Sequence, residues 1–502
     1  MDCPLTPHGV VRPGAAILAL SGGLALGVVW QPLLALTAVA GISAAVGARY
    51  FPLQIEKLFL RSLLILLVGY AVFGRTFAGI GVLPVYVGEV VLGIGLLTLV
   101  GNGIRFVPRQ KATTYLLIVF MGWCALRTIP FLGVHGLDAL RDGVLYGYGL
   151  FALLIAPLLL RGDLIERIPD LYARLIPWIV LCAPAYVVFS QWTGTDGIPG
   201  TAMTGPKPGD VAVHLGGAAA FLLAMRRQRA GYRPGSRPFL ESAAWPVLLL
   251  GLVAMGSLTR GGLVAAFGAM FIVVVLLPFK AAKKLVLAGA VGLLVASLWL
   301  GWGGSLPGRE SRSISPEQIV KNLSSIGGGG GGEGLDDTRT WRLMWWNTIL
   351  DYTLYGSYFW TGKGFEVNLT YDDGVVTDPH DPSRDPHNGH LTVLARTGVP
   401  GLVLWTALQL TFAFNMLLGF TRARRAGQDT RASLFAWVLA YWLACLVNAS
   451  FDVYLEGPQG GIWFWCIFGY GMALFAIQSR SGHRARARSY PSRPQSDQLA
   501  HV

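Results

Sequence analysis

The sequence predicts an all-α polytopic membrane protein with about 14 transmembrane helices, within a range of about 12 to 14, and one large extracytoplasmic loop that contains short helices. Of its 502 residues, 53% are hydrophobic and only 13% are charged, about half the charged share of soluble globular proteins. The mean hydropathy is +0.53. Neither a soluble domain nor a disordered chain accommodates so much apolar surface, so both classes are excluded.

The predicted spans are the apolar stretches of roughly 20 residues, the length that crosses a bilayer. Both termini are expected on the cytoplasmic side. The stretches lie near residues 15–30, 32–48, 59–78, 82–101, 112–128, 143–160, 171–192, 211–225, 243–258, 261–279, 284–303, 399–418, 432–450 and 461–478.

The distribution of basic residues supports this topology. The net charge is +13, and most of the 40 Lys and Arg residues fall in the connections that the prediction places inside. Cytoplasmic loops of membrane proteins carry such an excess of basic residues. The charge is therefore explained without nucleic acid, and no nucleic-acid partner is expected. The basic clusters lie at 226–237, 280–284, 422–431 and 480–493.

These spans divide the chain into four predicted regions. Residues 1–303 form an N-terminal transmembrane region of about eleven helices. Residues 304–398 form the large outer loop, and residues 399–478 form the closing transmembrane helices. Residues 479–502 form a basic cytoplasmic tail that we expect to be disordered.

Several basic residues remain in the short outward-facing segments, where they oppose the orientation bias. Each is as well explained by an arginine that reaches lipid headgroups as by a binding role. Taken together, the four arginines among them, with Glu89 and Asp142 nearby in the sequence, indicate an anion site lined by ion pairs. The residues are Arg75, Arg127, Arg141, Lys207 and Arg260.

The outer loop begins with a Ser/Gly-rich connector that includes six glycines at 327–332. After it, the spacing of Trp341, Trp345 and Ile349 predicts a helix with one apolar stripe, and we expect this stripe to lie along the membrane interface. Asp337 is a candidate N-cap for that helix.

The second half of the loop contains residues that predict a turn and a short helix. A turn is predicted at Gly362-Lys363-Gly364, followed by a long Asp/Pro stretch. A short helix is predicted from His387 to about residue 397, with Gly398 as its C-terminal glycine. His387 and His390 are one helical turn apart, so both can face the same side.

These residues resemble the signature of the O-antigen ligase and surface-polysaccharide polymerase superfamily. The pattern is His387-Asn388, nine residues, and then Gly398-Val399-Pro400-Gly401. Three further segments are similar to the family, namely "GSLTRGG" around Arg260, the spacing from Arg342 to Trp346 before the glycine turn, and "LRDGVLYGYGL" around Arg141. The resemblance runs from about Glu89 to the C-terminus and is strongest over 256–401. The long loop, its glycine run and the high number of spans depart from the family pattern.

The resemblance implies a membrane glycosyltransferase in the bacterial cytoplasmic (inner) membrane. Such an enzyme transfers a glycan from an undecaprenyl-diphosphate carrier to an acceptor hydroxyl at the outer face, during synthesis of O-antigen, exopolysaccharide or capsule. The implied partners are the lipid-linked donor, membrane lipids and an acceptor. A glycan, a lipid core and a protein all remain possible acceptors, so ligase, polymerase and protein O-glycosyltransferase stay open.

The residue types suit this chemistry. Arginines stabilise the negative charge that grows on a leaving diphosphate, and histidine has a pKa suited to a general base. We therefore predict His387 and Arg260 as catalytic residues. Diphosphate binding is assigned to Arg342, Arg141 and Arg75, and acceptor binding or support of the site to Asn388, His390 and Asp452.

A metal site is an alternative use of the Asp/His-rich stretch. Its spacing matches no zinc motif, and its prolines make it awkward for a cage. We expect no metal and no cofactor, and the resemblance implies a metal-independent reaction. The possible ligands are Asp378, His380, Asp381, Asp385, His387 and His390.

The competing function is that of a transporter or flippase of lipid-linked oligosaccharides. Transporters often show matched halves and ionisable residues near the midplane. Here no internal repeat is evident, and the ionisable residues gather at one predicted face. This asymmetry favours a one-sided active site.

Overall fold

The computed structural model describes most of the chain between residues 50 and 489. The chain divides into two compact units, one of residues 1–63 with 91–106 and the other of residues 64–90 with 107–502. Beyond isolated positions at 286–298, the described segments are 50–82, 85–102, 111–135, 139–161, 164–193, 206–225, 238–277, 306–307, 313–326, 335–376 and 384–489.

The first part of the chain is helical apart from one short antiparallel ladder. That ladder pairs β1 (Gly81–Val82) with β2 (Val85–Tyr86). The helices are α3 (Pro52–Phe73), α4 (Arg75–Ala78), α5 (Val87–Asn102), α6 (Lys111–His135), α7 (Ala139–Asp142), α8 (Val144–Gly147), α9 (Gly149–Leu159), α10 (Leu164–Thr193), α11 (Pro208–Met225), α12 (Pro238–Leu258) and α13 (Arg260–Leu276).

The second part holds another short antiparallel ladder, between β3 (Leu306–Pro307) and β4 (Ser313–Ile314). The helix α20 runs on to Ser489, into the segment predicted as a tail. The remaining elements are α15 (Pro316–Ile326), α16 (Leu335–Leu350), a π-helical turn η3 (Asp351–Tyr355), α17 (Leu369–Asp372), α18 (Gly389–Arg425), α19 (Asp429–Ala449) and α20 (Pro458–Ser489).

Seven helices in the described residues are long and apolar enough to cross a membrane, so the chain is a multi-pass helical membrane protein. Each coincides with a predicted stretch. They are Ala112–Gly133, Leu140–Leu159, Leu164–Val187, Pro208–Met225, Gly389–Arg425, Asp429–Ala449 and Pro458–Arg480, and three shorter apolar helices cover Val87–Leu99, Trp245–Leu258 and Arg260–Leu276.

The total of about 14 spans stays a prediction. The stretches near 15–30 and 32–48 lie outside the described residues, and only isolated residues of the stretch near 284–303 are described. The stretch near 59–78 falls mainly on α3.

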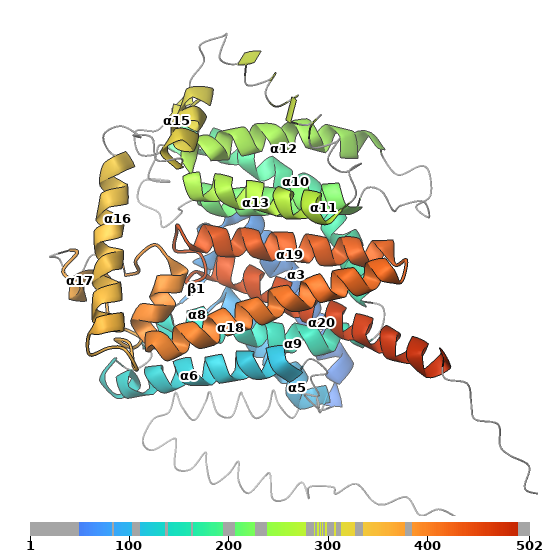
Figure 1. Cartoon of the computed structure of the whole chain (residues 1–502), viewed down its shortest axis with the longest axis horizontal. Coiled ribbons are helices and arrows are strands. Elements are labelled where there is room, and N and C mark those ends of the chain that lie inside the picture. Colours follow the sequence, from blue (N-terminus) through green and yellow to red (C-terminus); the bar gives the residue numbers. More distant parts are fainter. Residues whose placement is uncertain are drawn as a thin grey trace, which may run out of the picture. The chain divides into compact units, whose positions relative to one another are not determined.

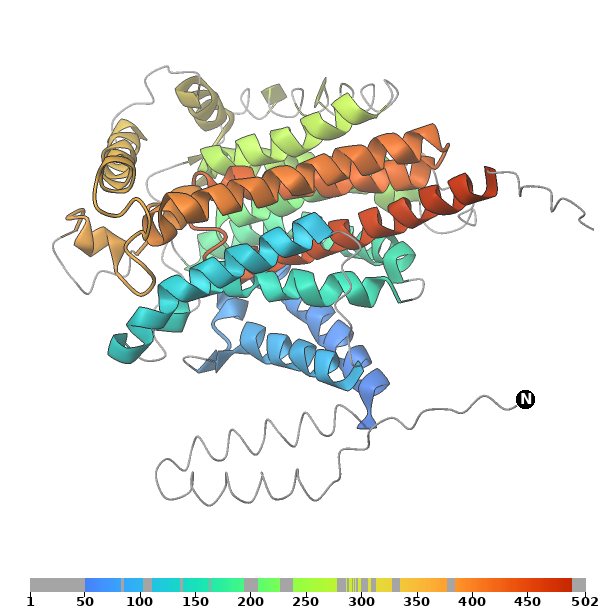
Figure 2. The ribbon, with the colours of Figure 1, turned by 60° about the horizontal axis from the view of Figure 1, so that its bottom comes forward.

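Small residues allow the central helices of the larger unit to pack closely. Helix α13 packs against α11 and α19, and all three run side by side in both views (Figures 1 and 2). A Cβ on Gly216 would lie 2.8 Å from the Cα of Ala266, and one on Gly217 would lie 2.7 Å from the ring of Tyr441. Such close approach is typical of membrane helices, whose association depends on tight packing.

Helix α18 consists of two helical segments joined at Gly398. Gly398 has φ 69° and ψ −174°, a conformation that glycine adopts without a steric penalty. A Cβ there would lie 2.5 Å from the carbonyl oxygen of Phe359. The predicted short helix before Gly398 is therefore confirmed, but it begins at Gly389 with Asn388 as its N-cap, not at His387.

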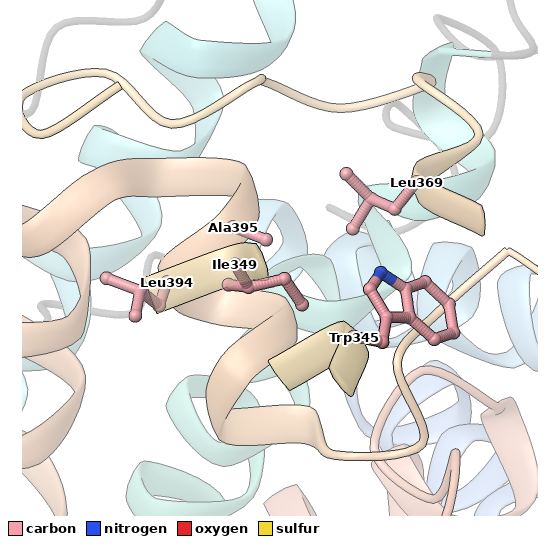
Figure 3. Packing of buried hydrophobic residues seen from close by; sticks show 5 residues of the cluster. All are labelled: Trp345, Ile349, Leu369, Leu394 and Ala395. Atoms are coloured by element: carbon pink, nitrogen blue, oxygen red, sulfur yellow. The ribbon is translucent and has the colours of Figure 1, made fainter. Parts of the chain in front are cut away.

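Helix α16 carries the predicted apolar stripe, which turns inward. Trp345 and Ile349 are buried against Leu369, Leu394 and Ala395, as Figure 3 shows. The helix lies across the ends of the bundle helices (Figure 1). The stripe thus forms the core of the outer segment, and placing it along the membrane interface was wrong for these side chains. Since α16 begins at Leu335, Asp337 lies within the helix and is not its N-cap.

Candidate active site

A cavity of about 1320 Å³ lies where several helix ends of the larger unit meet. It is lined by the first residues of α11, α13 and α20, by the end of α19, and by the segment that leads into α18. The structure brings together six of the predicted site residues there: Arg75, Arg141, Arg260, Arg342, His387 and Asp452. Asn388 and His390 do not line it.

The charges of the cavity are strongly concentrated. Further basic residues on its wall are Lys207, Arg339, Arg384 and Arg396. The acidic residues are Glu89, Asp142, Asp385, Asp452 and Glu456. Arg127, one of the arginines predicted for the anion site, does not line the cavity and instead donates a hydrogen bond to the carbonyl of Thr361.

His387 has an unusual backbone conformation at the wall of the cavity. Its φ is 53°, in the left-handed region that few non-glycine residues adopt. Its ring Nδ1 lies 3.5 Å from Oδ1 of Asp452, and the ammonium of Lys207 lies 2.7 Å from the same oxygen. Asp452 therefore lies between the ammonium of Lys207 and the Nδ1 side of the imidazole.

The electrostatic surroundings keep Asp452 ionised. Burial alone would raise the pKa of this carboxyl, but the neighbouring ring of His387 and the charge of Lys207 outweigh burial. Together they hold the pKa of Asp452 well below its ordinary value. The Asp452 carboxylate therefore places a fixed negative charge beside the ring of His387.

The residues on both sides of His387 are anchored. The indole Nε1 of Trp346 donates to the carbonyl of Pro386 at 2.8 Å. The side chain of Asn388 accepts hydrogen bonds from the backbone N–H groups of His390 and Leu391 and caps α18. Strained backbone persists where the surroundings over-determine it, and such strain is concentrated at functional sites.

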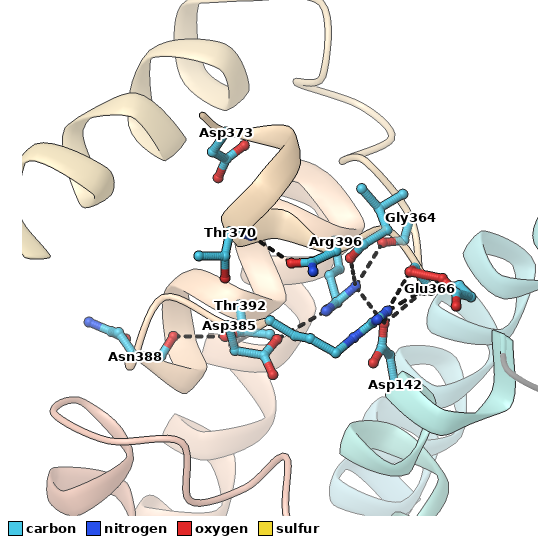
Figure 4. Close-up of polar contacts among 12 residues, drawn as sticks. Asp142, Gly364, Glu366, Thr370, Asp373, Asp385, Asn388, Thr392 and Arg396 are labelled. Carbon is cyan, nitrogen blue, oxygen red and sulfur yellow. Dashed lines mark hydrogen bonds and ion pairs between the residues drawn. The ribbon is translucent and has the colours of Figure 1, made fainter. Parts of the chain in front are cut away.

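Asp142 is the centre of a buried ion-pair network next to this segment (Figure 4). Its Oδ2 accepts from the backbone N–H of Glu366 at 2.9 Å and pairs with Arg396 at 3.0 Å and Arg384 at 3.3 Å. Arg396, whose side chain is 1% exposed, also pairs with Asp385 at 3.0 Å. Since Arg384 and Asp385 precede His387 by only a few residues, the network holds the histidine-bearing segment against α7.

We expect Asp142→Asn to lower the free energy of unfolding by about 3 kcal/mol, because one partner of a buried ion pair is removed while Arg396 remains buried. Denaturant unfolding in detergent micelles measures this change. The matched control is Asp372→Asn, because Asp372 is half exposed and Lys363 keeps its second partner, Asp373. That control is expected to cost less than about 1 kcal/mol, and equal costs for the two variants would contradict the role of the network.

Arg260 and Arg342 both line the cavity, and both belong to segments that contact Phe451. A guanidinium nitrogen of Arg342 donates to the carbonyl of Phe451 at 2.8 Å. A Cβ on Gly261 would lie 2.7 Å from the Cβ of Phe451, so the start of α13 packs directly on this residue. Thr259 caps α13 by accepting from the N–H of Gly262, which fixes the helix turn that carries Arg260.

Arg75 belongs to the same end of the bundle through the turn at Gly74. Gly74 has φ 54°, and a Cβ on it would lie 2.6 Å from the Cα of Pro206. The turn therefore packs against the residue that precedes Lys207. Arg141 lines the cavity from α7, directly before Asp142.

Asn388 and His390 support the site from behind. Besides the cap formed by Asn388, the indole Nε1 of Trp405 donates to Nδ1 of His390 at 3.0 Å. These bonds fix the first turn of α18. The supporting role that was one of the two predicted for them agrees with this geometry, and nothing in the described contacts carries the acceptor-binding role.

Glu456 is a buried carboxyl beside the same turn. A Cβ on Gly389 would lie 3.4 Å from its Oε1, and neither carboxyl oxygen has a hydrogen-bond partner within the described residues. Burial, with a smaller contribution from the negative charge of Asp385, raises the pKa of Glu456 from 4.5 to about 8. The proton keeps this carboxyl neutral near pH 7.

We expect this carboxyl to make folding stability fall as the pH rises. Between pH 4.5 and about 8 the folded protein keeps a proton that the unfolded chain has released, so stability decreases by at most about 1.4 kcal/mol per pH unit. Glu456→Gln removes this dependence. From pH 5 to 8, the melting temperature of the variant should rise relative to that of the parent protein. Parallel profiles of melting temperature against pH would contradict the raised pKa.

Several site residues were not predicted from the sequence as members of the site. Arg384 and Arg396 lie in or beside the recognised motif, and Lys207 was noted only as an outward-facing cation. Their partners are distant in the chain, as with Lys207 and Asp452. Part of the proposed metal-ligand stretch, including Asp378, His380 and Asp381, lies outside the described residues, and the part of the chain that the structure describes contains no group of three or more potential metal ligands.

The fold and the cavity together define a class: a multi-pass helical membrane protein with a cavity lined by arginines, carboxylates and one strained histidine at one set of helix ends. Residues 245–406 match the family model described as O-Antigen ligase. This match agrees with the family that the motifs predict, and it supports a membrane enzyme of the general ligase and polymerase type. None of the curated proteins compared with the chain matches it significantly.

Proposed function

We propose that this protein transfers a glycan from an undecaprenyl-diphosphate carrier to an acceptor hydroxyl, at the outer face of the bacterial cytoplasmic membrane, during synthesis of a surface polysaccharide. The observation that carries the proposal is the His387–Asp452–Lys207 chain beside the arginines of one cavity. This combination places a general base next to an anion-binding surface, as the reaction requires.

His387 is the general base in this proposal. The acceptor oxygen forms a bond to the anomeric carbon of the donor glycan, and its proton passes to Nε2 of His387. Asp452 holds the ring through Nδ1 and stabilises the imidazolium that results. General-base assistance of this kind contributes about 10²- to 10⁴-fold to the rate.

Arg260 and Arg342 act on the leaving group. The bond between the anomeric carbon and the diphosphate oxygen breaks, and negative charge grows on the lipid diphosphate. The two arginines stabilise that charge as it develops, and the hydrogen bond of Arg342 to the carbonyl of Phe451 orients its guanidinium in advance. Arg75 and Arg141 bind the rest of the diphosphate from the opposite elements of the wall.

The distribution of charge supports an outer location. The cavity lies at the starts of α11, α13, α18 and α20, whereas a basic cluster lies at the opposite end of α18 and the adjoining start of α19. Because cytoplasmic ends carry the excess of basic residues, the cavity belongs at the outer side. The cluster comprises Arg422, Arg424, Arg425 and Arg431.

The experiment that tests this proposal is glycan transfer by the purified protein in detergent. The donor is an undecaprenyl-diphosphate oligosaccharide, a chelator is present throughout, and lipid-core, oligosaccharide and peptide acceptors are compared. We expect transfer that is insensitive to the chelator. A ladder of product lengths indicates a polymerase, and a single addition indicates a ligase.

Two outcomes would contradict the proposal. Loss of transfer in chelator, restored by a divalent cation, would overturn the metal-independent mechanism. Absence of transfer to every acceptor, combined with movement of the donor across the bilayer of liposomes, would replace the transferase with a flippase.

A further inference from the structure

Two polar side chains near the cavity, Asn448 in its wall and Asp210 next to the lining residue Gly209, are buried without hydrogen-bond partners. Asp210 is 4% exposed and Asn448 is 1% exposed. Neither the carboxyl oxygens of Asp210 nor the amide oxygen and nitrogen of Asn448 have a partner within the described residues. Buried polar groups are destabilising unless they are hydrogen-bonded, so an unpaired set of this kind in a native structure indicates a ligand or ordered water.

The two side chains lie at the junction of three helix ends. A Cβ on Gly209 would lie 2.9 Å from Oδ1 of Asn448, so the start of α11 packs on the end of α19. The amide of Gln459, at the start of α20, lies beside Asp210. Asn448, Gly209 and Gln459 all line the cavity, and Asp210 lies in the first turn of α11, where a carboxylate is favoured by the helix dipole.

This polar pair adjoins the base that accepts the proton. Lys207 pairs with Asp452 at 2.7 Å, and its charge also acts on Asp210. The lysine therefore stands between the carboxylate that orients His387 and the carboxylate of Asp210. Both Asp210 and Asn448 therefore lie near the Lys207–Asp452 pair, and the charge of Arg75 also acts on Asp210.

The chemistry of the pair selects hydroxyl groups. A carboxylate repels phosphate, whereas it accepts hydrogen bonds from hydroxyl groups. A sugar hydroxyl donates to Asp210 while it accepts from the amide nitrogen of Asn448, and a neighbouring hydroxyl donates to the amide oxygen. A serine or threonine side chain has one hydroxyl, which is consumed in the reaction, and leaves the pair unsatisfied.

We propose that Asp210 and Asn448 form an acceptor-sugar subsite, which binds ring hydroxyls next to the hydroxyl that reacts. This inference rests on the proposed function and narrows its acceptor to a glycan. A hydroxyl-bearing peptide in place of the sugar loses these hydrogen bonds. The subsite therefore also sets acceptor specificity.

The test measures KM for donor and acceptor separately in the full-length protein and in two near-isosteric variants, Asp210→Asn and Asn448→Leu. The acceptor probes are oligosaccharides ending in galactose, glucose or N-acetylglucosamine, each with deoxy analogues that lack one ring hydroxyl next to the reacting one. We expect both variants to raise the acceptor KM by about 10- to 100-fold and to leave the donor KM unchanged. With the correct deoxy acceptor, parent and variants should have equal KM.

Control variants separate the subsite from general stability. Gln409→Leu removes another buried amide with an unpaired nitrogen, away from the cavity, and should change neither KM. Binding of the same oligosaccharides is also measured by calorimetry in the His387→Asn background, so that a result does not depend on turnover. There Asp210→Asn should weaken binding by the same factor.

Each remaining outcome decides against the subsite. A rise in donor KM alone would assign the pair to the donor glycan. Equal effects on normal and deoxy acceptors, or a loss of stability with unchanged KM and unchanged binding, would leave Asp210 and Asn448 as a water-filled structural pair. Failure of the parent protein to transfer any glycan would count against the proposed function, whereas parent transfer with these variant results counts against the subsite alone.

Discussion

Replacement of His387 by asparagine is expected to reduce glycan transfer by about 10²- to 10⁴-fold, the contribution of a general base. Asparagine removes the proton acceptor but tolerates the left-handed backbone that this position requires, with φ 53°. The folded protein should therefore be retained. Initial rates with undecaprenyl-diphosphate oligosaccharide measure the loss, and the melting temperature checks the fold.

A second variant distinguishes the chemical role of His387 from a packing role. His387→Gly also fits the left-handed backbone and leaves space for free imidazole. Recovery of transfer on addition of imidazole is expected if the ring acts as a base. Transfer by His387→Asn within about tenfold of the parent rate would instead show that another group takes the proton.

Replacement of Arg260 by alanine is expected to lower kcat by about 10²- to 10³-fold, the usual cost of removing one pre-oriented donor to developing charge. The donor KM should change much less, because the charge on the leaving diphosphate grows mainly in the transition state. Single-turnover rates at saturating donor measure the chemical step directly.

Two control variants test whether the effect of Arg260→Ala depends on the charge of the side chain and on its position. Arg260→Lys keeps the charge but loses the planar pair of donors, so its rate should fall between those of the parent and the alanine variant. Arg424→Ala removes an exposed arginine at the opposite end of the bundle, where Arg424 pairs with the exposed Asp429, and should leave transfer unchanged. An Arg260→Ala effect confined to donor KM would assign Arg260 to ground-state binding.

Much of the local architecture was predictable because its causes are local. A helix ends at Gly398, whose dihedral angles only glycine adopts easily. The residues before Gly398 in the sequence indicate where that helix lies. The stripe of Trp345 and Ile349 follows from helical periodicity. Its partners did not follow from periodicity, because an apolar stripe can face either a membrane or another helix. The structure places Leu369 and Leu394 against it.

In the candidate site, too, some residues were predictable from the sequence and others were not. His387, Arg260 and Arg342 were identified from motifs, and Arg75 and Arg141 from arginines that oppose the orientation bias. The ion-pair partners of the site residues could not be predicted from sequence patterns. Arg396 pairs with a carboxylate that lies far away in the chain, at Asp142.

The amino-acid sequence by itself determined that this chain enters a membrane, where the long apolar helices that the structure describes lie, and which residue types can perform group transfer. These properties depend on hydropathy, helix length and local dihedral preference, all of which act over about 20 residues or fewer. Only the tertiary structure decided which charges meet. The Lys207–Asp452–His387 chain and the unpaired Asp210 and Asn448 arise where the ends of separate helices converge. Pairing between such ends depends on how the helices pack, because no spacing along the chain encodes it.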